Sequence, residues 1–168
     1  GLAQADRAAH ALARLTPGRI VSSDLSRARR TAEALSVLTG LPVHTDADLR
    51  ETFAGQWQGL TRSELETRFG DDLAQWAAGS DIRPGGGETR KEVAERMVAA
   101  VTRALADVPA DSTLVVATHG GSARAAIGAL LGLPAEHWAA LGVLSNCAWS
   151  VLEENSSGYG PRWRLQEY

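Results

Sequence analysis

The stretch VVATHGGSARA, from Val115 to Ala125, sets an apolar run directly before a histidine, two glycines and a helix-like segment. The longer run TLVVAT, residues 113–118, is typical of a parallel strand that is buried on both faces. Further strand-like runs alternate with helical segments along the chain. The pattern predicts a three-layer α/β/α fold with a mostly parallel central sheet, in which TLVVAT is a central strand.

Helical periodicity and start signals place the other elements. Thr61 with Glu64, and Thr89 with Glu92, form capping boxes that predict helix starts. Glycine at position 40 is a stop signal for the helix before it. We expect helices over 2–15, 25–39, 61–69, 71–78, from 89 to about 105, and 122–131, strands over 19–23, 41–45 and 113–118, and a closing hairpin of CAWSVLE and RWRLQEY.

Composition limits the classes of function. The chain has 168 residues, 44% apolar residues and a net charge of -3, which predicts one domain, residues 1–168, with residues 61–88 as a lid-like insertion. No basic patch suggests a nucleic-acid partner, and no apolar run approaches the roughly 20 residues of a membrane-spanning helix. Cys147 is the only cysteine, which fits a cytoplasmic location. A homodimer remains possible.

Polar residues follow the predicted strands at the edge where ligands bind in open α/β sheets. Backbone N–H groups at a helix start attract an anion, and Gly120 and Gly121 would let it approach closely. His119 could donate to a phosphate oxygen. The alternative is a tight turn in which Ser122 caps the helix and His119 is an ordinary polar residue. We favour the phosphate site, because the turn does not explain a histidine at the end of a buried strand.

Two further side chains could serve such a site. Arg27 lies in the first turn of a helix that follows a strand, where its guanidinium could grip a phosphate through two bonds. Glu51 lies in a long loop; near an anion its pKa would be raised, and it could hold a proton for a leaving group. The histidines show no metal-ligand spacing and no nucleotide-binding motif is present, so we expect neither metal nor cofactor.

These segments together resemble the histidine phosphatase superfamily, also called phosphoglycerate mutase-like. SSDLSRARRTAEAL, LRETFAGQWQG, PGGGET and VVATHGGSARA look like four of its motifs in order. The resemblance implies that Arg27 and His119 bind the phosphoryl group and that Glu51 is the proton donor. LRET, WQGLT, WAALG and RWRL are shared with the actinobacterial branch that includes glucosyl-3-phosphoglycerate phosphatase.

The nucleophile of that family is a histidine in an R-H-G motif on the first strand, and this sequence has no R-H-G. The chain begins without Met and directly in an amphipathic helix, so we expect the first strand and the nucleophile to lie upstream of Gly1. The resemblance then implies hydrolysis of a small phosphorylated metabolite through a phosphohistidine. A mutase and a non-catalytic module that binds phosphorylated ligands are the alternatives. The short insertion between Glu51 and His119 favours hydrolysis over mutase activity.

Overall fold

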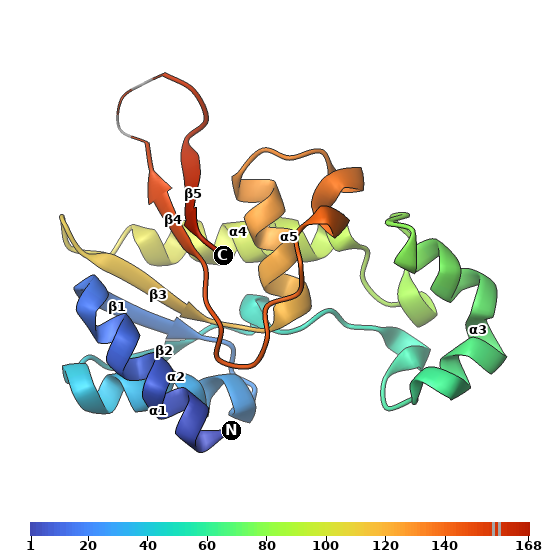
Figure 1. Cartoon of the computed structure of the whole chain (residues 1–168), viewed down its shortest axis with the longest axis horizontal. Helices are drawn as coiled ribbons and strands as arrows, with labels where there is room; N and C mark the ends of the chain where they lie inside the picture. Colours follow the sequence, from blue (N-terminus) through green and yellow to red (C-terminus); the bar gives the residue numbers. More distant parts are fainter. Residues whose placement is uncertain (156, 158) are drawn as a thin grey trace.

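The computed structural model describes residues 1–155, 157 and 159–168. Within these residues a parallel sheet has the strand order β2-β1-β3, from β1 (Pro17–Ser22), β2 (Val43–Thr45) and β3 (Thr113–Ala117) (Figure 1). Ser22 pairs with Thr45 on one side and with Ala117 on the other. The carboxyl ends of the strands therefore finish on one line, and the residues that follow them meet at one edge of the sheet.

Helices cover both faces of this sheet. α1 (Leu2–Leu12) and α2 (Ser26–Thr39) lie on one face, and α4 (Arg90–Leu105) and α5 (Gly120–Leu130) lie on the other. Ile20 packs with the α1–α2 layer and its neighbour Val21 with the α4–α5 layer, because successive side chains of a strand point to opposite faces. The predicted three-layer α/β/α fold is confirmed.

The prediction that TLVVAT is a central strand is wrong for the described residues. There β1 is central and β3 is an edge strand, and every residue of β3 is only partly buried. Val115 packs toward the α1–α2 layer and Val116 toward the α4–α5 layer. The continuous apolar run thus reports that helices cover both faces of the strand, and it carries no information about how many strands flank it.

Local signals placed the helix ends well. Both capping boxes are present, at Thr61 before α3 (Arg62–Ala77) and at Thr89 before α4. The two short helices expected over 61–78 are joined into α3, with a kink at Phe69. Gly40 ends α2 with φ of 73°, a left-handed conformation that glycine adopts without strain. Among the apolar side chains of α1 and α2, Leu2 and Leu38 are exposed.

The remaining elements surround this core. β4 (Val151–Glu154) and β5 (Trp163–Glu167) form the expected antiparallel hairpin, although β4 begins at Val151 rather than at Cys147. α3 stands to one side of the layers (Figure 1). Short 3-10 helices complete the chain: η1 (Ala13–Leu15), η2 (Ala47–Leu49), η3 (Gly55–Trp57), η4 (Pro84–Gly86) and η5 (Ala135–Ala140). Among the described residues, no helix is both long enough and apolar enough to cross a membrane.

Candidate active site

His119 is buried at the carboxyl edge of the sheet and is held on both ring nitrogens. It is 8% exposed and is the N-cap residue of α5. Arg27 Nε donates to its Nδ1 at 3.2 Å, and its Nε2 lies 2.9 Å from Ser23 Oγ. The first turn of α2 and the end of β1 therefore meet the start of α5 at this imidazole.

The contact with Arg27 fixes the protonation of the imidazole. A guanidinium can only donate hydrogen bonds, so Nδ1 must accept and the ring proton of the neutral form lies on Nε2, which donates to Ser23. Burial lowers the pKa of His119, and the positive charge of Arg27 lowers it further, against a smaller opposite effect of Glu51. His119 is therefore neutral at physiological pH.

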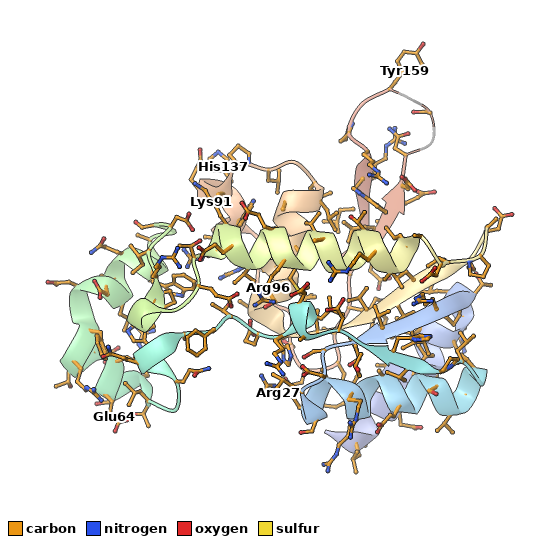
Figure 2. The ribbon with its side chains drawn as sticks, turned by 180° about the vertical axis from the view of Figure 1, so that it is seen from behind. Arg27, Glu64, Lys91, Arg96, His137 and Tyr159 are labelled. Atoms are coloured by element: carbon orange, nitrogen blue, oxygen red, sulfur yellow. The ribbon has the colours of Figure 1, made fainter. Side chains whose placement is uncertain are left out.

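Arg27 can still bind a ligand through most of its N–H groups. Only its Nε takes part in a side-chain hydrogen bond within the described part of the chain. Its two terminal nitrogens remain available, and the paired N–H groups of a guanidinium match the spacing of two phosphate oxygens. Figure 2 shows Arg27 near the start of α2, on the side that faces the loop carrying Glu51. The structure thus brings Arg27 and His119 into direct contact.

Glu51 lies at the N-terminus of α5, where its carboxylate accepts backbone hydrogen bonds. Gly121 N donates to Oε2 at 3.1 Å, and Ser122 N donates to Oε1 at 3.0 Å. Thr52 N also donates to Oε1, at 2.9 Å. Helix N-termini attract anions, as the sequence predicted, but here a side chain of the protein takes the place of that anion at Gly121 and Ser122.

This arrangement explains the two glycines and corrects the assignment of Ser122. A Cβ atom on Gly121 would lie 2.7 Å from Glu51 Oε1, and one on Gly120 would lie 2.6 Å from the side chain of Val143. Ser122 is not the helix cap; it lies within the first turn, fully buried, and its hydroxyl is 3.0 Å from Glu51 Oε1. Both glycines and the serine therefore serve the positioning of Glu51 and the loop at Val143.

The pKa of Glu51 is lowered in this structure, and the expected rise, which concerns the site with an anion bound, stays a prediction. Burial raises the pKa, but the hydrogen bonds from Thr52, Gly121 and Ser122 together outweigh it and the pKa is lowered. Each of these donors favours the charged carboxylate over the neutral acid. The sequence did not indicate these donors, because two of them lie 70 and 71 positions away along the chain.

Sequence reasoning did not identify Ser23, Arg96 and Glu88 as residues that hold the site. Ser23 is fully buried and orients His119; the pair of serines after a strand was its only signal. Arg96 extends from α4 toward the loop that carries Glu51 (Figure 2). Its guanidinium donates to the carbonyl oxygens of residues 48, 50 and 51 and pairs with Glu88 at 2.7 and 3.0 Å.

The glycine-rich segment PGGGE, residues 84–88, packs against this loop. Glu88 accepts a hydrogen bond from Phe53 N at 2.8 Å. A Cβ atom on Gly87 would collide with the carbonyl group of Phe53, and one on Gly85 would collide with the backbone of residues 54–57. The glycines thus allow close contact between two backbones. Within residues 1–155, 157 and 159–168, no cluster of three or more His, Cys, Asp or Glu side chains could hold a metal ion.

The fold and this site define a phosphoglycerate mutase-like α/β domain with a paired arginine and histidine at the carboxyl edge of its sheet. The model of the histidine phosphatase superfamily, branch 1, matches residues 1–166. The chain belongs to this superfamily.

Relatives of known name agree with this membership. Glucosyl-3-phosphoglycerate phosphatase from Mycolicibacterium vanbaalenii is 38% identical over 98% of this chain and 79% of its own length. The protein of that name from Mycobacterium tuberculosis strain H37Rv is 39% identical, with the same shares. A 2,3-bisphosphoglycerate-dependent phosphoglycerate mutase from Methylobacterium radiotolerans is 36% identical, over 79% of this chain and 66% of the mutase.

Solved structures show the same similarity. The native mycobacterial glucosyl-3-phosphoglycerate phosphatase superposes with a TM-score of 0.91 at 39% identity, covering all of this chain and 85% of the other. Its complex with inorganic phosphate gives a TM-score of 0.91 at 37% identity, covering 99% and 84%. The expected similarity to this actinobacterial branch is confirmed.

Proposed function

We propose that the protein is a phosphatase that hydrolyses a phosphomonoester of a small molecule. The observation that carries the proposal is the direct contact of Arg27 with His119 beside a carboxylate held at the start of α5. This arrangement offers positive charge and N–H donors for the phosphoryl oxygens and a carboxyl group for proton transfer. Phosphoryl transfer depends mainly on such positioning and charge stabilisation.

Each residue of the site has a role in this proposal. Arg27, through its terminal nitrogens, and His119 bind the equatorial oxygens of the phosphoryl group, with the backbone of Gly120 beside them. His119 can donate a hydrogen bond from Nε2 to a phosphate oxygen once its hydrogen bond to Ser23 Oγ breaks. The N–H of Gly121 already donates to Glu51, so we assign Gly121 to positioning of the carboxylate rather than to phosphate binding.

Glu51 is the proposed proton donor to the leaving oxygen. Its lowered pKa means that it is ionised at neutral pH before substrate arrives. A phosphate group beside it adds negative charge, and a like charge raises the pKa of a carboxylate. Glu51 can then take a proton from the phosphate monoanion or from water and pass it to the ester oxygen as the bond to phosphorus breaks.

The nucleophile implied by the family is a histidine of an R-H-G motif, and we propose that it comes from outside residues 1–168. Its nitrogen forms a bond to phosphorus while the bond to the ester oxygen breaks and this oxygen takes the Glu51 proton. Water then attacks phosphorus, gives a proton to Glu51 and releases phosphate from the histidine.

The names of the relatives support a substrate class. Glucosyl-3-phosphoglycerate phosphatases are 38–39% identical over nearly the whole chain, so we propose a sugar phosphate or a phosphoglycerate-type monoester as substrate. The single cysteine supports the proposal of a cytoplasmic location, where thiols stay reduced.

The test is a phosphate-release assay on the full-length protein with 3-phosphoglycerate, glucose phosphates and p-nitrophenyl phosphate. We expect one inorganic phosphate for each substrate consumed, without a bisphosphate primer. Conversion of 3-phosphoglycerate to its isomer without phosphate release would identify a mutase. Binding of the esters without any turnover would identify a binding module, and either result would reject the proposal.

A further inference from the structure

A narrow cleft opens beside the carboxylate of Glu51, between α4, α5 and the end of α3. It is lined by Thr52, Trp76, Arg90, Gly121, Arg124 and Trp138, among others. Thr52 and Gly121 also donate their N–H groups to Glu51. The cleft therefore begins at the group proposed to protonate the leaving oxygen, and the alcohol part of a substrate would lie in it.

Arg90 is a fixed part of the cleft wall. Its guanidinium stacks over the ring of Trp76 at 3.7 Å from the ring centre. It also donates to the carbonyl oxygen of Ser80 at 3.1 Å and to that of Trp76. Burial, with the nearby charge of Arg124, lowers the pKa of Arg90. The cleft thus holds two cations that repel each other.

Arg124 has no acidic partner within the described residues, where no hydrogen bond or ion pair of its side chain occurs. Carboxylates on the neighbouring segments are engaged elsewhere: Glu51 with the start of α5, Glu92 with Arg83, and Asp81 with Lys91 and with the charge of Arg90. Arg124, without an ion pair within the described residues and beside Arg90 and a flat aromatic wall, forms a site that an anion would stabilise.

We propose that this cleft binds a carboxylate on the alcohol part of the substrate through Arg124. This inference rests on the proposed function. The fork of the Arg124 guanidinium matches the two oxygens of a carboxylate, while Arg90 contributes charge from its fixed position. Substrates that carry a carboxylate next to the phosphate ester are therefore preferred over neutral ones.

The test compares two ligands of nearly equal shape, phosphoglycolate and ethyl phosphate, which differ by the carboxylate. Their affinities for the full-length protein are measured by calorimetry at one ionic strength. We expect phosphoglycolate to bind about tenfold or more tightly, the usual effect of a charge-assisted pair. Arg124→Met should remove this preference and leave ethyl phosphate binding within about twofold.

Two control variants separate the explanations. Arg62→Met removes an exposed cation of α3 and should leave both affinities unchanged. Arg124→Lys keeps the charge without the fork and should retain part of the preference, so that the test does not depend on one variant. Equal binding of the two ligands by the native protein, or equal losses on Arg124→Met, would overturn the carboxylate site alone. Failure of both ligands to bind would instead reject the proposed function on which it rests.

Discussion

At the scale of single residues, the site depends on which hydrogen-bond donors face which acceptors. Arg27 and Ser23 together set the tautomer of His119, and three backbone N–H groups keep Glu51 ionised. Neither carboxylate nor imidazole therefore carries an extra proton at neutral pH. In the proposed mechanism, the proton that Glu51 passes to the leaving oxygen therefore comes with the substrate or from water.

The change Glu51→Gln tests this role. We expect the turnover of the full-length enzyme to fall by about 100- to 10,000-fold, the usual contribution of a general acid. Affinity for inorganic phosphate should stay the same or increase, because a negative charge leaves the anion site. Steady-state kinetics and phosphate titration measure the two quantities.

Glu64→Gln is the matched control for that change. Glu64 is an exposed carboxylate in the capping box of α3, away from Arg27 in Figure 2, and its loss should leave turnover unchanged. Equal losses of turnover and phosphate affinity in Glu51→Gln would show that Glu51 supports binding and is not the acid.

At the scale of elements, the loop that carries Glu51 is held by side chains from other elements. Arg96 of α4 bonds three carbonyl oxygens of residues 48–51 and also Glu88. Arg103, two turns further along α4, pairs with Asp46 and Asp48 at the exposed start of the same loop. The two arginines therefore differ mainly in burial, which makes them a natural comparison.

The pair of changes Arg96→Met and Arg103→Met tests how the loop is fixed. Arg96→Met removes the charged partner of Glu88, which keeps only its bond from Phe53 N, and takes the Arg96 donors from three carbonyl groups. We expect this change to cost about 2–4 kcal/mol of unfolding free energy and to lower turnover. Arg103→Met removes an exposed pair and should change little. Urea unfolding curves measure both. Similar small effects of the two changes would show that Arg96 does not fix the loop.

Sequence patterns predicted where helices and strands begin and end better than they predicted which segments contact one another. The capping boxes at Thr61 and Thr89 were correct because all their contacts lie within three residues. Within the described residues β3 is an edge strand, and its apolar run indicates covered faces rather than strand order, so a central position next to a strand from outside residues 1–168 stays a prediction. The role of Ser122 was wrong, since its partners lie about 70 positions away in the loop of Glu51. Arg27, Glu51 and His119 were predicted to share a site because each follows a strand or matches a family motif; the structure brings Arg27 to His119 and Glu51 to the start of α5, and their roles stay proposals.

At the scale of the whole molecule, the helical layers bury the site groups at the carboxyl edge of the sheet and couple their protonation to folding. The pKa values of Glu51 and Glu88 are lowered, although burial raises both. For Glu51 the hydrogen bonds from Thr52, Gly121 and Ser122 outweigh burial. For Glu88 the contacts with Arg96 and Phe53 N outweigh it. Burial and Arg27 lower the pKa of His119. In each case the folded protein takes up a proton less readily than the unfolded chain.

These shifts predict how stability depends on pH. Where the unfolded chain binds more protons, the unfolding free energy falls as pH falls. For His119 the unfolding free energy begins to fall below its ordinary pKa of 6.5. For Glu51 and Glu88 it begins to fall below 4.5. Each loss of unfolding free energy is complete once the pH is below the lowered pKa of that group in the folded protein. We therefore expect urea unfolding between pH 7.5 and 3.5 to show a stability loss that steepens below pH 4.5. His119→Gln should remove the fall near pH 6, and Glu51→Gln should reduce the one below pH 4.5. A flat profile in the native protein, or a native-like profile in His119→Gln, would mean that the imidazole of His119 is not held neutral by folding.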